Sequence, residues 1–268
     1  MRAPEPVLTS HLFAPLNREL IALLRGLSPE EWSAPTVAGL WTVKDVAAHL
    51  LDTALRRLSK HRDGHVPPSA GFRNVSELVN GLNAEGVAFA RRHSPRVLTD
   101  LLEDAGDQQA GFFATLDPFG EAMWGVSWAG ESQSQNWLDV ARELTERWHH
   151  QQQIRDATRR PPLYDIYLGA VIATFVRALP FTYRDVVAPP GTAVVFRSTE
   201  DWSLVREEEW RLYSGIAPSP AATITMPGDT AWRLFTKGLT REEARSRTSV
   251  EGDARLGEVL FGTIAIVA

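Results

Sequence analysis

A long helix over Leu138–Ala157 constrains this chain more than any other feature of its sequence. The stretch contains no glycine or proline, and its apolar residues repeat at the spacing of one helix face: Trp137, Val140, Leu144 and Trp148. Glu146 and His150 are four residues apart, so they lie one turn apart on one face of the helix. A carboxylate and an imidazole in this arrangement can occupy two ligand positions of one metal ion, and a third ligand must come from another segment.

His49 is the best candidate for the third ligand. It lies in the second turn of another predicted helix, which begins after Thr42 as the N-cap and carries Asp45 at the acidic third position. The apolar stripe of that helix comprises Val43, Val46, Ala47, Leu50, Leu51, Ala54 and Leu58. His49 lies at the edge of this stripe, where a histidine is more often a hydrogen-bonded core residue than a metal ligand.

The residues alone leave alternatives open at this site. A glutamate and a histidine at helical spacing are typical of a solvated face. The stripe that contains them lies opposite the tryptophans and comprises Asp139, Glu143, Glu146, His150 and Gln153. Periodicity does not decide which of the two stripes faces the protein interior. His149 is a rival ligand, but it points about 100° away from His150, so we expect it to flank or orient the site.

Further helices are predicted over Leu8–Leu27, Val75–His93 and Pro95–Leu116, and a loop over residues 64–73. Long helices separated by loops form a bundle, and bundles hold metal sites between facing helices. The N-terminal part of the chain is therefore expected to be a helical bundle.

The pattern changes after Arg159-Arg160-Pro161-Pro162, which we interpret as a domain boundary. A helix from about Asp165 to Leu179 comes next. Strands are then predicted over Ala193–Arg197, Trp202–Val205, Glu209–Tyr213, Ala222–Met226 and about Arg247–Val250. One more helix runs through Phe235, and a last helix reaches Ile266. We expect an α+β fold class with two domains, a helix bundle at 1–160 and an α+β domain on an antiparallel sheet at 161–268.

Composition excludes several classes of function. The net charge of -5, without a basic block, predicts neither nucleic-acid binding nor an anionic-membrane partner. No apolar run approaches the roughly 20 residues of a membrane span, and the first residues lack a signal-peptide core, so a cytoplasmic location is expected. The chain has no cysteine, so any thiol used in its chemistry must come from outside.

The motif Gly39-Leu40-Trp41-Thr42-Val43-Lys44-Asp45-Val46-Ala47-Ala48-His49, with the distant Glu146-Arg147-Trp148-His149-His150, resembles the DinB-like superfamily. Within it, the chain resembles the mycothiol-dependent maleylpyruvate isomerase family. The resemblance implies an up-and-down four-helix bundle in which His49, Glu146 and His150 bind a divalent metal, usually zinc. It also implies a C-terminal domain like sterol carrier protein 2, which the segments Thr230–Leu234 and Val250–Asp253 fit.

This resemblance implies an enzyme that uses a low-molecular-weight thiol, such as mycothiol, on a small electrophilic substrate as an isomerase or S-transferase. Two other functions remain open. One is a hydrolase with a zinc-bound water, in which Glu143 or His149 serves as the base. The other is a non-catalytic protein that binds an apolar ligand among the C-terminal aromatic residues Phe175, Phe181, Trp202, Trp210, Trp232 and Phe235. The sequence identifies no catalytic or thiol-binding residue and no oligomeric state.

Overall fold

The computed structural model describes residues 1–66 and 75–266, and these form two compact units. Unit 1 contains Met1–Val7, Trp124–Arg142 and Tyr164–Ile266, while the described residues of unit 2 lie within Leu8–Met123 and Glu143–Leu163. Each unit is therefore assembled from segments that are distant in sequence. The predicted boundary after residue 160 stays a prediction, and most of the predicted loop at 64–73 lies outside the described residues.

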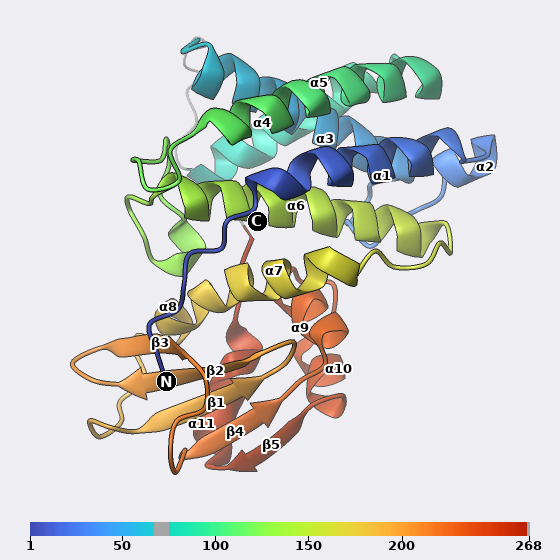
Figure 1. The fold of residues 1–268 in the computed structure, drawn as a ribbon. Coiled ribbons are helices and arrows are strands. Elements are labelled where there is room, and N and C mark those ends of the chain that lie inside the picture. Colours follow the sequence, from blue (N-terminus) through green and yellow to red (C-terminus); the bar gives the residue numbers. More distant parts are fainter. Residues whose placement is uncertain (67–74, 267–268) are drawn as a thin grey trace. The chain divides into compact units, whose positions relative to one another are not determined.

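Unit 2 is a bundle of helices (Figure 1). Its elements are α1 (Phe13–Arg25), α2 (Pro29–Trp32), α3 (Val43–Arg57), α4 (Val75–Ala90), α5 (Pro95–Thr115) and most of α6 (Asn136–Ala157). A 3-10 turn at Ser10–Leu12 precedes α1, and a π-helical turn at Leu58–Arg62 follows α3. All five long helices predicted for this region are present, with ends displaced by a few residues.

The start of α3 is fixed by side-chain hydrogen bonds, as the sequence predicts. The Asp45 amide donates to the Thr42 hydroxyl at 3.3 Å, and the Thr42 amide donates to the Asp45 carboxylate at 3.1 Å, which completes a capping box. Arg91 donates two further hydrogen bonds to Asp45, at 2.8 and 3.1 Å. Because this start is defined, the side chain of His49 in the next turn has a defined direction.

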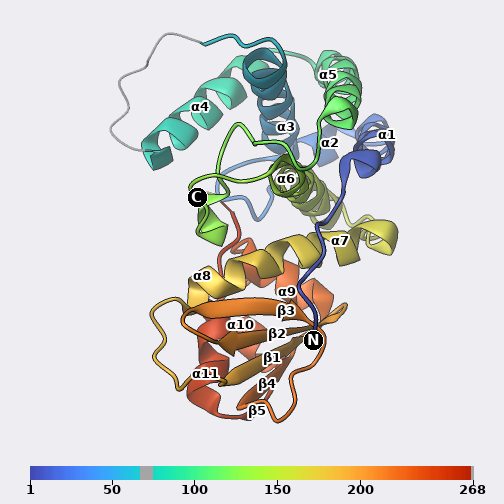
Figure 2. The ribbon, with the colours of Figure 1, turned by 60° about the vertical axis from the view of Figure 1, so that its left-hand side comes forward.

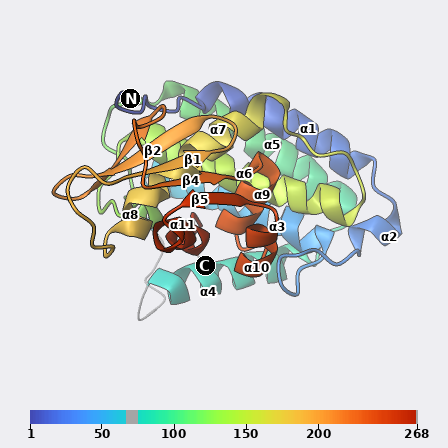
Figure 3. The same cartoon turned by 90° about the horizontal axis from the view of Figure 1, so that it is seen from below.

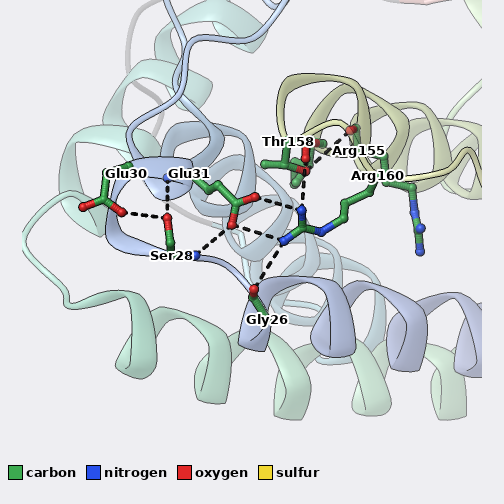
Figure 4. Close-up of polar contacts among 8 residues, drawn as sticks. Gly26, Ser28, Glu30, Glu31, Arg155, Thr158 and Arg160 are labelled. Carbon is green, nitrogen blue, oxygen red and sulfur yellow. Dashed lines mark hydrogen bonds and ion pairs between the residues drawn. The ribbon is translucent and has the colours of Figure 1, made fainter.

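The proline-containing segment after α6 is anchored within unit 2 (Figure 4). Arg159 ends the helix in the left-handed region, at φ 54°. Arg160 then forms an ion pair with Glu31 at 2.9 Å and donates to the Gly26 carbonyl at 3.4 Å. Glu31 also completes the capping box of Ser28 at the start of α2, so these contacts join the end of α6 to the α1–α2 turn.

Helix α5 packs against both α1 and α3. The crossing with α1 is close at Gly106, where an added Cβ would lie 2.1 Å from Oδ1 of Asn17. Asn17 itself donates hydrogen bonds to the Glu103 carbonyl and the Asp107 carboxylate. The absence of a side chain at Gly106 therefore makes room for a buried polar residue of α1.

Unit 1 contains a five-stranded sheet with the order β3-β2-β1-β4-β5, part of which is visible in Figure 3. The strands are β1 (Ala193–Arg197), β2 (Asp201–Arg206), β3 (Trp210–Ser214), β4 (Ala222–Thr225) and β5 (Ser249–Gly252). The backbones of Arg2 and Ser214 also form a two-bond antiparallel bridge, at 3.1 and 3.0 Å. The N-terminal segment therefore extends the outer edge of β3.

The expected α+β class is confirmed, but the sheet is mixed rather than purely antiparallel. Strand β4 pairs with β1 in parallel, whereas the other neighbouring pairs are antiparallel. The reason lies in the connection after β3. Ala217 packs on Ala193 and Val195 of β1, and its amide donates to the Ser203 hydroxyl of β2. The chain thus crosses one face of the sheet before β4 begins, instead of turning back as a hairpin.

The remaining elements of unit 1 are helical (Figure 2). They are α7 (Asp165–Phe175), α8 (Leu179–Tyr183), α9 (Gly228–Phe235), α10 (Arg241–Ser246) and α11 (Ala254–Val259), with 3-10 turns at Ser127–Ala129, Val176–Ala178 and Leu260–Gly262. The sequence analysis missed α10, although Thr240 and Glu243 form a capping box at its start. The last predicted helix is also wrong in length, since α11 ends at Val259.

Aromatic side chains form much of the core of unit 1. The ring of Phe235 lies 6.2 Å from that of Phe175 and 6.1 Å from that of Phe196, and the rings of Tyr183 and Trp210 are 5.3 Å apart. Of the six aromatic residues considered as a pocket lining, five are at most 4 % exposed, and Phe181 is 38 % exposed. Their arrangement is that of a packed core.

One stretch of unit 1, Asp165–Tyr183, is apolar and long enough to meet a simple criterion for a membrane span, which the sequence analysis did not anticipate. The stretch is divided into α7, a 3-10 turn and α8. Half of its most apolar window is buried within the protein. It therefore behaves as a core helix, and its composition is weak evidence for a membrane.

Candidate metal centre

The structure brings together the three residues predicted as metal ligands. His49 lies on α3, and Glu146 and His150 lie on α6. One potential ligand atom from each residue lies within 4.8 Å of the other two. Nε2 of His150 is 3.7 Å from Oε2 of Glu146, and the rings of His49 and His150 are 4.7 Å apart at 72°. One ion can therefore reach a nitrogen of each imidazole and an oxygen of the carboxylate.

Helix α6 buries residues of both stripes that the sequence analysis considered. Trp148 is fully buried and donates to the Leu163 carbonyl at 2.8 Å. On the polar stripe, Glu143 and His150 are also buried. The interpretation of this stripe as a solvated face is therefore wrong. The sequence did not reveal it because neighbouring parts of the chain cover both stripes.

Burial keeps the imidazoles neutral. It lowers the pKa of His49 well below the ordinary value of 6.5, and the nearby His150 contributes to this shift. Burial likewise lowers the pKa of His149 to about 4 and that of His150 to about 3, in the latter case against the opposing effect of Glu146. Neutral imidazoles are the form that binds a metal ion, because the ligand lone pair is then available at neutral pH.

A divalent metal fits this group of residues. Two imidazoles and one carboxylate are a donor set typical of catalytic zinc. Among the described residues, no hydrogen-bond partner is found for the buried Nδ1 of His49. A buried polar atom without a partner costs free energy, and such atoms are rare in native proteins unless an ion, water or ligand satisfies them.

Trp41 covers the two histidines, and the sequence analysis did not recognise it as a site residue. Its ring lies 5.0 Å from that of His49 and 6.4 Å from that of His150. The turn before it is closed by the Thr36 hydroxyl, which donates to the Trp41 carbonyl at 2.8 Å. Leu40 in this turn is 98 % exposed. The signals in the sequence are that Trp41 immediately precedes the N-cap Thr42 and belongs to the motif that carries the family resemblance.

His149 lies beside the three-residue group rather than within it. Its Nδ1 donates to the Thr145 carbonyl at 2.9 Å, and its ring lies 4.0 Å from that of His150. This position agrees with the expectation that His149 flanks the site. The proximity of His149 also contributes to the lowered pKa of His150.

Two other polar residues of α6 lie close to the predicted ligands. Gln153 accepts a hydrogen bond from Nδ1 of His150 at 2.8 Å. Arg147 is only 3 % exposed and donates from Nη1 to the Leu50 carbonyl of α3 at 3.4 Å. Arg147 thus links the two helices that carry the predicted ligands. The sequence analysis singled out neither role. That of Arg147 depends on Leu50 of another helix, whereas that of Gln153 rests on a spacing of three residues within α6.

Comparison with known proteins agrees with the resemblance inferred from the sequence motifs. Residues 13–155 match the family described as the mycothiol maleylpyruvate isomerase N-terminal domain. The crystal structure of the mycothiol-dependent maleylpyruvate isomerase is similar, with a TM-score of 0.50 and 12% identity, covering 84% of this chain and 88% of that chain. A mutant of that enzyme gives a TM-score of 0.49 and 11% identity over the same shares of both chains.

The first of these structures supports a similarity of fold alone, because its identity to this chain is so low. No match was found among curated protein sequences. The family match is independent of these structural comparisons and extends over more than half of the chain. This protein therefore belongs to the mycothiol maleylpyruvate isomerase N-terminal domain family.

Proposed function

We propose that this protein is a metal-dependent enzyme that uses a low-molecular-weight thiol, such as mycothiol, to isomerise or S-conjugate a small electrophilic substrate. The observation that carries the proposal is the convergence of His49, Glu146 and His150 in a chain without cysteine. Three protein ligands leave one position of a tetrahedral zinc open, which is typical of catalytic sites. Membership of the family agrees with a thiol-dependent activity.

The three side chains would hold the metal ion, which we propose to be zinc. When bound, such an ion lowers the pKa of a coordinated thiol and keeps it as the nucleophilic thiolate. Two neutral imidazole nitrogens and the Glu146 carboxylate are ligands that zinc takes at catalytic sites. Trp41 lies over the imidazoles and would restrict the access of water.

The class of reaction follows from what a thiol supplies. A bound thiol adds to an electrophilic carbon; an isomerase releases it again after rotation of the former double bond, and an S-transferase leaves it on the product. We further propose that residues 1–160 form the metal-binding domain and residues 161–268 a sterol-carrier-like domain. The proposed partners are the thiol and a small-molecule substrate, without nucleic acid or membrane, in the cytoplasm.

Removal of each imidazole tests the metal site. We expect the purified protein to contain about one equivalent of divalent metal and His49→Ala and His150→Ala to lose it, together with thiol-dependent turnover. The exposed His11 provides a matched control, and His11→Ala should keep both properties. Elemental analysis gives the metal content. Full metal loading of either ligand variant would disprove the ligand assignment.

Cobalt substitution tests the use of a thiol separately. We expect added mycothiol to change the visible absorption of the cobalt-loaded protein, because a sulfur ligand alters the coordination of the ion. A spectrum that does not respond to thiols, combined with hydrolysis of ester or amide substrates, would instead support the zinc-water hydrolase.

A further inference from the structure

The hydrogen bond between His150 and Gln153 bears on which ring nitrogen of His150 carries a proton. Nδ1 of His150 and Oε1 of Gln153 are 2.8 Å apart, and both side chains are buried. An amide oxygen accepts hydrogen bonds and cannot donate one, so Nδ1 must provide the hydrogen. In a neutral imidazole, the other nitrogen, Nε2, then carries a lone pair.

The position of Glu146 agrees with this assignment. Nε2 of His150 lies 3.7 Å from Oε2 of Glu146, which is longer than the roughly 3.2 Å limit of a good N–H···O hydrogen bond. Both atoms are electron-pair donors in the Nδ1–H tautomer, and they repel each other unless a cation lies near both. The opposite tautomer would place a hydrogen on Nε2 and block that nitrogen as a ligand.

We infer that Gln153 is a positioning residue, whose amide oxygen holds His150 in the Nδ1–H tautomer and presents the Nε2 lone pair to the centre formed with His49 and Glu146. Gln153 lies three residues after His150 on α6, so one helix fixes both side chains. Metal-binding histidines commonly donate their second N–H to an oxygen acceptor, which orients the ring. The effect on metal affinity rests on the proposed function, whereas the tautomer is a property of the metal-free protein.

Three variants separate this role from simple packing. Gln153→Leu removes the acceptor at similar size, and Gln153→Glu retains an oxygen acceptor. Gln152→Leu is the matched control, because Gln152 is also buried on α6 but accepts from the Leu163 amide at 3.0 Å. Circular dichroism and thermal unfolding establish that each variant is folded before it is compared.

The first measurement is the ring ¹⁵N chemical shifts of the metal-free protein, with His150→Gln to identify the His150 signals among the seven histidines. We expect the Nδ1–H tautomer in the unmodified protein, in Gln153→Glu and in Gln152→Leu, and a shift towards Nε2–H in Gln153→Leu. An Nε2–H tautomer in the unmodified protein, or an unchanged tautomer in Gln153→Leu, would overturn the inference.

The second measurement is the affinity for Co²⁺ by competition with a chelator. We expect Gln153→Leu to bind Co²⁺ about 10- to 100-fold more weakly, and Gln153→Glu to restore binding. An equal loss in Gln152→Leu would show that packing alone is responsible and would overturn the inference. If the unmodified protein binds no Co²⁺, the proposed function fails, and the tautomer measurement still decides the role of Gln153.

Discussion

The fluorescence of Trp41 can report the binding of a metal ion by the two histidines. Trp41 is the residue whose indole ring lies against both His49 and His150. The chain contains nine tryptophans, so a variant at Trp41 is needed to isolate the contribution of this ring to the emission. A paramagnetic ion bound by the histidines would lie close enough to quench Trp41 emission efficiently.

We therefore expect Co²⁺ to quench part of the tryptophan fluorescence, and Trp41→Phe to abolish most of that quenching while Co²⁺ still binds. Phenylalanine keeps an aromatic ring over the imidazoles, so the ligands should stay in place. Trp210→Phe, a change at a buried tryptophan of β3 that packs on Tyr183, serves as the control and should quench like the unmodified protein. Equal quenching in Trp41→Phe would place the ion away from this ring.

At the scale of residues, the sequence analysis named the three side chains that the structure brings together, but not the residues that contact them. Helical spacing placed Glu146 and His150 on one face, because four residues make one turn. The residues made His49 a candidate and the family motif strengthened it, since the approach of α3 to α6 is not encoded by local periodicity. Trp41 was missed because its contacts with the histidines form only when the segment before α3 packs on them. The role of Gln153 was missed although its spacing of three residues from His150 is local.

At the scale of helices, local hydrogen bonding was predictable and pairing between distant segments was not. The capping boxes of Ser28 and Thr42 could be predicted because each motif spans only four residues. The same motif is present at Thr240, but the sequence analysis did not use it to predict α10. The parallel pairing of β1 with β4 could not be predicted, because it depends on the path of the chain across the sheet.

The crossing of α1 and α5 predicts opposite effects for two glycines of the same helix. Gly106→Ala should destabilise the protein by about 1–3 kcal/mol, because the new methyl group displaces the buried, hydrogen-bonded Asn17. At Gly111 an added Cβ meets no atom within 4 Å, so Gly111→Ala should stabilise by up to about 1 kcal/mol. Urea unfolding measures both values, and equal effects would contradict the close crossing.

The capping box of α3 predicts a pH-dependent contribution from Asp45. Burial raises the pKa of this carboxyl, but Arg91 and Thr42 lower it more, so the pKa lies below the ordinary value of 3.8. A lowered pKa in the folded state stabilises the protein above the unfolded pKa, and this stabilisation is lost as the pH falls through the folded pKa.

Asp45→Asn should therefore cost about 0.5–1 kcal/mol at neutral pH, a modest value because the Arg91 side chain is 58 % exposed. Asparagine keeps an oxygen that can cap the helix, so the difference reports mainly the charge. Urea unfolding of both proteins from about pH 7 to pH 3.5 should show the difference shrinking on acidification. A difference that grows towards low pH would contradict the lowered pKa.

For the whole molecule, a bound metal ion should couple to the stability of unit 2. Any ligand that binds only the folded state stabilises it, by about 2.7 kcal/mol at a concentration 100 times its Kd. All three proposed ligands belong to unit 2. We expect Zn²⁺ to raise the unfolding temperature of the metal-free protein and a chelator to reverse the change. Calorimetry of His150→Ala should show no response to Zn²⁺, and an identical rise would indicate binding elsewhere.

The backbone bridge between Arg2 and Ser214 has a consequence for the order in which the polypeptide matures on the ribosome. Arg2 leaves the exit tunnel long before its partner Ser214 is synthesised, because the two residues are far apart in the sequence. The closing of so large a loop is entropically costly, which makes this a late step. Until this bridge forms, the outer edge of β3 at Ser214 is unpaired and can pair with another nascent chain. The segment around Arg2 then protects this edge from such pairing.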